Sequence, residues 1–363
     1  MSKVVIKIGT NCLTHSETGI PEPEVLGSLT KGIYYLINKG YKPVIVTSGA
    51  IGLGLKALGL NKRPKSIILK QASASIGQSI LMNIYNQFFS LFHINIAQIL
   101  LTREDINDRE RYLNIRNTFE TLLTKNIVPI VNENDVVSVD EIKFGDNDTL
   151  SAIVSTIIDA DILIILTTTD GVYDRDPLIH KNAKRIKIVE KINDEFYKFI
   201  ENSKTSLGTG GMETKINAAK IATDVGVKTI IGSGLNPFQT IKNIFEGKDV
   251  GTTFLPSEKH LDSRKRWILY ALKPKGEIKI DKGAEDAIVF KGKSLLIPGV
   301  IDIKGDFNEK EPVIILNVKN KKIGQGLTNF SSITLRNLIT NKQKNTKLKE
   351  VIHRDNLSLY KNL

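Results

Sequence analysis

The strongest constraint on the fold is a series of uninterrupted apolar segments that alternates with helical stretches along most of the chain. Residues 43–47, 127–131 and 162–166 are such segments. A strand that is apolar on both faces is typical of a parallel sheet covered by helices on both sides. Residues 22–39 show helical periodicity and end before Gly40, a residue that commonly caps helices. We therefore predict an α/β fold with an open, mainly parallel sheet and helices on both faces.

The pattern changes near residue 255. Residues 256–273 begin with a proline and continue with polar and charged residues, which indicates a linker. Residues 274–355 contain short apolar strands separated by turns, which predicts a small β-rich domain. The expected organisation is an α/β domain over 1–255, then the linker, the β-rich domain and a tail over 356–363.

Composition places the chain among ordinary globular proteins. Of its 363 residues 41% are hydrophobic and 25% charged. No apolar run approaches the roughly 20 residues that a membrane helix needs, and Lys7 interrupts the apolar N-terminal run, unlike in a signal peptide. Cys12 is the only cysteine, so an intrachain disulfide is impossible. We expect a cytoplasmic protein with no membrane partner.

The excess of positive charge is uneven. The net charge is +12, and residues 274–363 carry 17 Lys and Arg against 10 Asp and Glu. A basic module attracts nucleic acid or anionic substrates, but a general richness in lysine is the favoured explanation of the charge taken alone. The aromatic residues of this region are widely spaced and do not interleave with arginine. We therefore do not expect RNA binding.

The tetrapeptide Gly145-Asp146-Asn147-Asp148 lies between a predicted strand and a predicted helix that begins near Thr149. Acidic and amide side chains gather at helix starts as caps, and Asp148 and Thr149 are both suitable caps. Capping and chemistry explain this segment equally well when it is taken alone.

Two polar, glycine-containing loops follow the first two predicted strands, and ligands of parallel sheets bind where the strands end. Lys7 lies inside the first strand, where burial is costly unless an anion meets it; an edge strand with a solvent-reaching lysine is the alternative. Gly9 permits close approach of another group. Ser48 and Gly49 begin a turn of small residues. Its backbone N–H groups are suited to binding an anion, and a tight turn without a ligand is an equally good interpretation.

Two further loops carry carboxylates and glycines. Asn132 and Asp135 precede Asn147 and Asp148, and this set suits an ammonium group, a lysine or Mg²⁺. Residues 208–215 combine glycines and threonines with a final lysine before a helix, which suits phosphate, although they lack Walker A spacing. A flexible surface loop is the alternative for this segment.

The combination of these loops is more informative than any one of them. Lys7 and Lys215, the glycine-rich turns and the carboxylates together fit phosphoryl transfer, which depends on positioning and charge stabilisation. The five histidines are scattered without metal-ligand spacing, so we assign no residue as a metal ligand.

Long strings of the sequence resemble the glutamate 5-kinase family of amino acid kinases, whose members carry a C-terminal PUA domain. The resemblance covers essentially the whole chain. It is carried by KIGT from Lys7, VTSGAI from Val46, KQASASIGQ from Lys70, LLTREDINDRERYLNIRNT from Leu100, IVPIVNENDVV from Ile127, FGDNDTLSA from Phe144, GTGGMETK from Gly208 and SRKRWI from Ser263.

The resemblance implies ATP-dependent phosphorylation of the side-chain carboxylate of L-glutamate to γ-glutamyl phosphate, the first step of proline biosynthesis. It implies Mg²⁺ as the ion that accompanies ATP, and proline as a feedback inhibitor. It also implies a homodimer or homotetramer and a functional link to glutamate-5-semialdehyde dehydrogenase. Kinases of the same fold that act on N-acetylglutamate, carbamate, aspartate or a nucleoside monophosphate are the alternatives.

The resemblance also implies residue roles. It implies catalytic roles for Lys7, Asp148 and Lys215, glutamate contacts for Ser48, Gly49, Asn132, Asp135 and Asn147, and ATP contacts for Lys7, Gly9, Thr167, Thr168, Thr209, Gly210, Gly211, Met212 and Lys215. One position departs from the family pattern, because Thr168 stands where an aspartate is usual, with Asp170 nearby.

Overall fold

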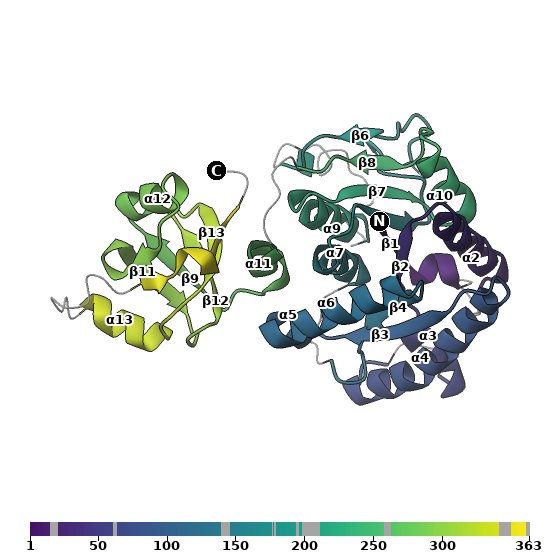
Figure 1. Ribbon diagram of the computed structural model, residues 1–363, viewed down its shortest axis with the longest axis horizontal. Helices are drawn as coiled ribbons and strands as arrows, with labels where there is room; N and C mark the ends of the chain where they lie inside the picture. Colours follow the sequence, from purple (N-terminus) through teal and green to yellow (C-terminus); the bar gives the residue numbers. More distant parts are fainter. Residues whose placement is uncertain are drawn as a thin grey trace. The chain divides into compact units, whose positions relative to one another are not determined.

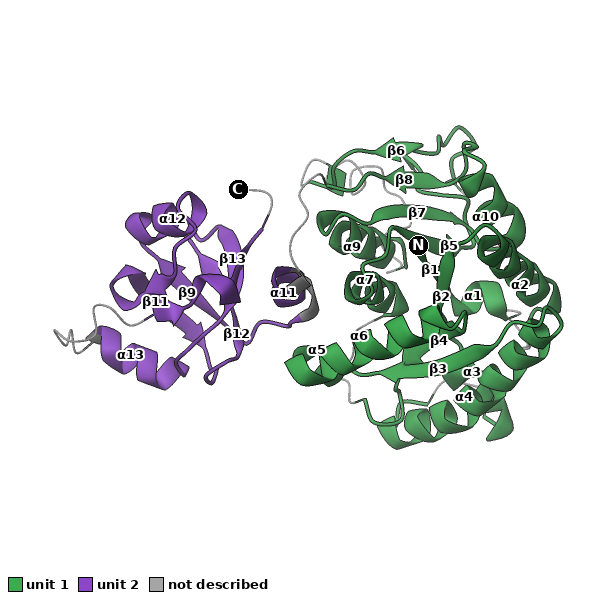
Figure 2. Cartoon of the chain, in the orientation of Figure 1, with its two compact units in different colours: residues 1–259 green, residues 260–363 purple. Residues whose placement is uncertain are grey.

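The structure of the protein is a computed structural model. It describes residues 1–14, 21–60, 64–138, 146–175, 177, 179–193, 196–197, 211–257, 263–340 and 350–360. The chain divides into two compact units, residues 1–259 and residues 260–363 (Figure 2). Each unit has its own sheet and its own apolar core.

The first unit is built on one eight-stranded sheet with the order β3-β4-β2-β1-β5-β7-β8-β6. All neighbouring strands are parallel except β7 and β8, which are antiparallel, so the predicted open, mainly parallel sheet is confirmed. The strands are β1 (Lys3–Ile8), β2 (Lys42–Val46), β3 (Ile96–Leu101), β4 (Val128–Glu133), β5 (Ile162–Thr167), β6 (Ile188–Val189), β7 (Lys228–Ser233) and β8 (Thr252–Phe254).

Helices cover both faces of this sheet. Figure 1 shows α2, α4 and α10 on one side of the central strands and α6, α7 and α9 on the other. The described helices of the unit are α1 (Thr10–Leu13), α2 (Pro23–Asn38), α3 (Ala50–Ala57), α4 (Ile67–Ser90), α5 (Arg103–Asn107), α6 (Arg109–Thr124), α7 (Asn147–Ile157), α9 (Gly211–Asp224) and α10 (Pro237–Phe245). None of the described helices combines the length and the apolar content needed to cross a bilayer.

The alternation of side chains along β1 explains how the sheet serves both core and site. Val4, Ile6 and Ile8 point to one face and are fully buried in a core shared with α2 and α4. Because successive side chains of a strand point to opposite faces, Val5 and Lys7 point to the other face. The same strand therefore supplies apolar side chains to the core on one face and a charged side chain, Lys7, on the other.

The start of α7 differs from the expectation for its cap. Asp148 and Thr149 were both suitable caps by sequence, but Asp146 caps the helix and accepts hydrogen bonds from the backbone N–H of Thr149 at 2.7 Å and from its hydroxyl at 3.3 Å. Because Asp146 satisfies the free N–H group, the carboxylate of Asp148 is available for other contacts.

The second unit is β-rich, as predicted. A five-stranded sheet has the order β11-β9-β12-β13-β15, and β10 and β14 form a separate pair. Its elements are α11 (Ser263–Arg266), a π-helix (Trp267–Ala271), β9 (Gly276–Ile280), α12 (Lys282–Val289), β10 (Leu295–Leu296), a 3₁₀ turn (Ile297–Gly299), β11 (Val300–Gly305), β12 (Pro312–Leu316), β13 (Lys322–Leu327), α13 (Ser332–Thr340), β14 (Glu350–Ile352), a 3₁₀ turn (Arg354–Asn356) and β15 (Leu357–Leu359).

Two stretches expected to lie outside domains have structure. Within the expected linker, residues 263–271 form helical turns whose Trp267 and Ile268 are buried. The Gln325 amide donates to the Ile268 carbonyl at 2.7 Å and to the Leu272 carbonyl at 3.1 Å. Within the expected tail, β15 pairs with β13. Apolar side chains explain both differences, since Trp267, Ile268 and Leu357 are buried within this unit.

Candidate active site

A carboxylate between two ammonium groups forms the centre of the site. Asp148 Oδ1 lies 2.7 Å from Lys7 Nζ, and Asp148 Oδ2 lies 3.1 Å from Lys215 Nζ. The three side chains come from β1, α7 and α9, which are far apart in the sequence. Asp148 is 3% exposed and Lys7 is 7% exposed, so water screens these charges weakly.

Lys7 is not on an edge strand. Strand β1 lies between β2 and β5, and Lys7 is paired in register with Val46 and Ile165. The alternative of a solvent-reaching lysine on an edge strand is therefore excluded. A cation at this central position requires an anionic partner, and Asp148 provides it.

The two lysines keep Asp148 ionised. Burial by itself raises the pKa of the Asp148 carboxyl, but the charges of Lys7 and Lys215, with hydrogen bonds from Lys7 and Thr214, outweigh burial and lower that pKa. Each oxygen of this ionised carboxylate therefore faces one ammonium group.

The first turn of α9 completes the charged cluster. The Thr214 hydroxyl is 2.9 Å from Asp148 Oδ2, and Lys215 Nζ donates to the Gly211 carbonyl at 2.8 Å. Sequence reasoning did not single out Thr214, although its position directly before Lys215 was the available signal. Gly211 is exposed, and Met212 is half-buried in the same turn.

Two predicted glycines lie in the loops that follow β1 and β2. A Cβ at Gly9 would lie 3.2 Å from Lys7 Nζ, so a side chain there would crowd the ammonium group. Gly49 has a φ of +108°, a conformation that favours glycine, and caps α3. Beside it, the Thr10 hydroxyl lies 3.1 Å from the Ser48 hydroxyl, a contact that sequence reasoning missed.

The predicted glutamate contacts lie along the same edge of the sheet. The Asn147 amide donates to the Thr47 carbonyl at 2.6 Å and to Asn132 Oδ1 at 3.0 Å. Asn132 is 3% exposed and lies behind Asn147, whereas Asn147 is half-buried. Asp135 is half-buried in the turn that follows β4.

The predicted ATP contacts are only partly within the described residues. Thr209 and Gly210 lie outside them. Thr167 ends β5, and its carbonyl accepts from the Gly234 N–H at 2.6 Å, while Thr168 is exposed. Asp170 lies 2.6 Å from the Tyr173 hydroxyl and 3.9 Å from Arg185. Asp170 is therefore engaged locally.

The donor set does not fit a metal ion held by protein side chains alone. Within the described ranges, no three His, Cys, Asp or Glu side chains are grouped as metal ligands. Both oxygens of Asp148 already face Lys7 and Lys215. Mg²⁺ commonly binds few carboxylates together with substrate phosphates, so an ion that arrives with a phosphate-bearing substrate does not need such a group.

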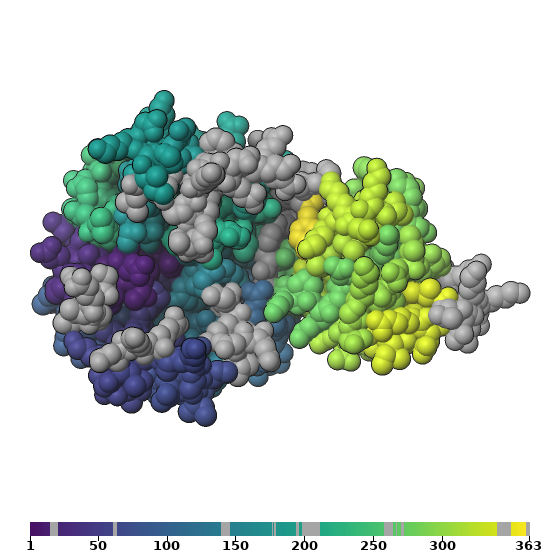
Figure 3. Space-filling model, turned by 180° about the vertical axis from the view of Figure 1, so that it is seen from behind, coloured from purple at the N-terminus to yellow at the C-terminus, as the bar shows by residue number. Residues whose placement is uncertain are grey.

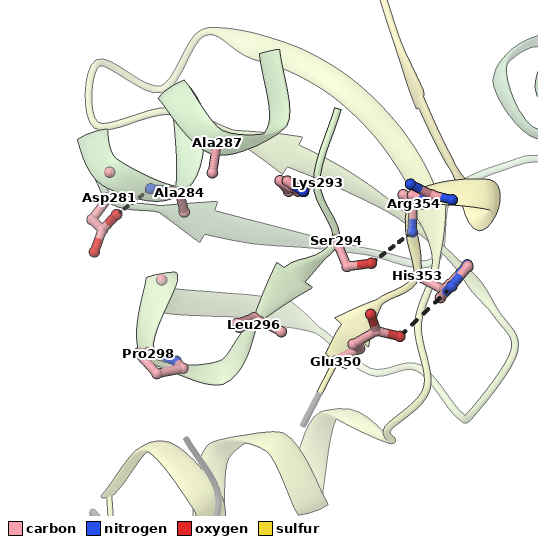
Figure 4. A pocket seen from close by; sticks show the side chains of 12 residues that line it. Asp281, Ala284, Ala287, Lys293, Ser294, Leu296, Pro298, Glu350, His353 and Arg354 are labelled. Carbon is pink, nitrogen blue, oxygen red and sulfur yellow. Dashed lines mark hydrogen bonds and ion pairs between the residues drawn. The ribbon is translucent and has the colours of Figure 1, made fainter. Parts of the chain in front are cut away.

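A separate cavity of about 710 Å³ lies in the second unit. Figure 4 shows basic side chains, Lys293 and Arg354, around the same hollow as the acidic side chains Asp281 and Glu350. The lining therefore carries both signs of charge. None of the side chains predicted for catalysis lines this hollow.

The fold and the charged cluster are those of a phosphoryl-transfer enzyme, and comparison with known proteins agrees. Residues 2–233 match the amino acid kinase family, and residues 276–352 match the PUA domain. The chain belongs to the amino acid kinase family.

The chain is also similar to individual proteins within and beyond this set of domains. The chain is 46% identical over 362 residues to the glutamate 5-kinase of a Thermoanaerobacter species, covering 98% of this chain and 97% of that protein. It is 42% identical over 363 residues to the glutamate 5-kinase of a Cyanothece species, covering 98% and 99%. The carbamate kinase from Giardia lamblia bound to AMP-PNP matches with a TM-score of 0.52 and 18% identity, over 70% of this chain and 99% of that chain, which shows a shared fold only.

Proposed function

We propose that the protein transfers the γ-phosphoryl group of ATP to the side-chain carboxylate of L-glutamate, giving γ-glutamyl phosphate as the first step of proline biosynthesis. The observation that carries the proposal is the Lys7–Asp148–Lys215 cluster at the carboxyl ends of parallel strands. The full-length similarity to glutamate 5-kinases supports the choice of acceptor.

The reaction brings two anions together, so positive charge is its main requirement. A glutamate oxygen forms a bond to the γ-phosphorus while the bond from that phosphorus to the bridging oxygen of ADP breaks. Lys7 and Lys215 offset the negative charge on the transferring group, and Asp148 holds both ammonium groups in place. The acceptor carboxylate is already ionised near pH 7, so no general base is needed.

The remaining predicted residues divide between the two substrates. We propose that Ser48, Gly49, Asp135 and Asn147 contact glutamate, with Asn132 behind Asn147. We propose that ATP is contacted by Lys7, Gly9, Thr167, Thr168, Thr209, Gly210, Gly211, Met212 and Lys215.

We propose that Mg²⁺ enters as the complex with ATP. The engagement of both Asp148 oxygens by Lys7 and Lys215 supports this route. The ion neutralises phosphate charge when it is bound, while the protein supplies the two lysines.

We further propose a homodimer or homotetramer formed through the first unit. Support comes from the N-terminal end of α4, where Ile67, Ile68 and Leu69 are 40%, 76% and 42% exposed. This helix belongs to the blue surface region in Figure 3. Neighbouring exposed apolar side chains favour contact with another protein surface.

Three proposals concern the cellular setting. Proline acts as a feedback inhibitor, and glutamate-5-semialdehyde dehydrogenase consumes the product, because an acyl phosphate is labile in water. The reaction takes place in the cytoplasm, a location supported by a sequence with a single cysteine.

The direct test is an acceptor panel with purified protein, ATP and Mg²⁺. Hydroxylamine traps an acyl phosphate as a hydroxamate, and ADP release reports transfer to any acceptor. The panel contains L-glutamate, N-acetylglutamate, carbamate, aspartate and UMP, each with and without proline. Hydroxamate formation that requires glutamate supports the proposal; faster transfer to another member of the panel contradicts it.

A further inference from the structure

A chain of side-chain amides lies behind Asn147. Asn147 Nδ2 donates to Asn132 Oδ1 at 3.0 Å, and Asn132 Nδ2 donates to Gln78 Oε1 at 3.0 Å. Gln78 Nε2 then donates to Gln98 Oε1 at 3.2 Å. The chain links α7, β4, α4 and β3. Gln78 and Gln98 have no part in the roles proposed above.

Backbone groups determine which way these amides face. The Glu133 N–H can only donate, and it donates to Asn132 Oδ1 at 2.9 Å. The Thr47 carbonyl can only accept, and it accepts from Asn147 Nδ2 at 2.6 Å. Asn147 must therefore turn its NH₂ group toward both partners. Its Oδ1 accepts no hydrogen bond from any residue that the structure describes.

We propose that Asn147 presents a carbonyl oxygen, rather than an amide N–H, to the acceptor substrate, and that Gln78 is the positioning residue that maintains this orientation. This inference rests on the proposed function. In glutamate, both carboxylates only accept hydrogen bonds, whereas the α-ammonium group donates. Asn147 Oδ1 therefore binds the α-ammonium group and selects an amino acid over a dicarboxylate without an amine.

Burial explains why Gln78 matters although it does not touch the substrate. Gln78 is 8% exposed and Asn132 is 3% exposed. Without the Gln78 acceptor, Asn132 Nδ2 is left unpaired in the interior, which is costly enough to favour rearrangement. A rotated Asn132 no longer offers Oδ1 to Asn147, so the orientation of Asn147 loosens.

The experiment compares L-glutamate with glutarate, which has the same two carboxylates and no amine. For each acceptor, KM and kcat are measured with the native sequence and with Gln78→Met, Gln78→Glu and Gln87→Met. In the Gln78→Glu variant, the side-chain carboxylate still accepts a hydrogen bond from Asn132 Nδ2. Gln87 lies on the exposed side of the same helix, so Gln87→Met is the matched control.

We expect the native protein to prefer glutamate over glutarate by about ten- to a hundred-fold in kcat/KM, the size of one hydrogen bond to a charged group. Gln78→Met should lower this preference about ten-fold by raising KM for glutamate, with kcat and the glutarate constants nearly unchanged. Gln78→Glu and Gln87→Met should keep the preference.

The outcomes separate this inference from the proposed function. If the native protein does not phosphorylate glutamate, the proposed function fails. If it phosphorylates glutamate and glutarate with equal kcat/KM, the role of Asn147 is overturned whatever the variants show. If Gln78→Met lowers kcat equally for both acceptors, Gln78 is only structural and its positioning role is refuted.

Discussion

Replacing Asp148 with asparagine removes one charge and almost no volume from the centre of the site. The side chains of Lys7 and Lys215 are only 8% and 12% exposed, so both cations remain largely buried in the variant. Removing one partner of a buried ion pair costs about 3–5 kcal/mol. Because Lys215 reaches the surface more than Lys7 does, we expect a loss of unfolding free energy near the lower limit, about 3 kcal/mol.

The expected loss of turnover is of a different kind. Loss of one group that stabilises charge in the transition state typically lowers kcat by about 10²–10³-fold. A domain with an ordinary stability of about 5–15 kcal/mol remains more than roughly 95% folded after losing 3 kcal/mol. Unfolding therefore cannot account for a hundred-fold loss of kcat in Asp148→Asn.

The pH dependence gives this variant a second signature. The folded-state pKa of Asp148 is lowered, because the charges of Lys7 and Lys215 outweigh the opposing effect of burial. Such a group stabilises the fold above its unfolded pKa, near 3.9, and this contribution is lost as the pH falls through the folded pKa. Asp148→Asn lacks this contribution and should lose less stability between neutral pH and acid.

The assay combines the hydroxamate rate with urea unfolding, at pH 7 and at several acid values. Far-ultraviolet circular dichroism follows the whole chain, and Trp267, the single tryptophan, reports on the second unit. Asp159→Asn is the matched control, since it breaks the partly exposed pair with Arg116 at a positive φ that asparagine tolerates. Near-native turnover by Asp148→Asn would refute the assigned role of the carboxylate.

Three shorter predictions concern neighbouring side chains. Lys215→Ala should lower kcat by about a hundred-fold or more, and Asp148 keeps Lys7 as a partner; a normal rate in the acceptor assay contradicts its role. Gly9→Ala should reduce kcat because the added Cβ would lie 3.2 Å from Lys7 Nζ, and an unchanged kcat would show that the ammonium moves aside without consequence. Burial raises the pKa of the Cys12 thiol more than Lys7 and Lys215 lower it, so native protein should react slowly with Ellman's reagent at pH 8 and quickly in urea; equal rates would contradict the burial.

The sheet was predictable because several of its strands contain uninterrupted apolar segments. Segments such as 43–47 and 162–166 allow few arrangements other than a parallel sheet between helices. The end of the linker was harder to predict, because Trp267 and its neighbours follow directly after a charged stretch. Their backbone carbonyls are bound by the Gln325 amide, more than fifty positions away, and sequence periodicity does not reveal such a contact.

The sequence made it possible to single out the charged residues of the site, but it did not reveal which side chains they or their neighbours contact. A lysine within a central strand and an aspartate at a helix start each require an explanation, so Lys7 and Asp148 are noticeable in the sequence. Gln78 carries no such signal, since a polar residue in a long helix is ordinary. Its contact with Asn132 joins α4 to β4, residues 54 positions apart in the sequence, so it arises only from the tertiary fold.

The tetrapeptide 145–148 shows why capping and chemistry need not compete. Asp146 satisfies the free N–H of Thr149 at the helix start, so the next two side chains are released from that task. Asn147 then faces Thr47 and Asn132, and Asp148 faces the two lysines. A helix that began two residues later would require Asp148 as the cap, and the lysines would lose their shared partner. The position of the cap is therefore part of the site, because it determines which carboxylate is available to organise the charge.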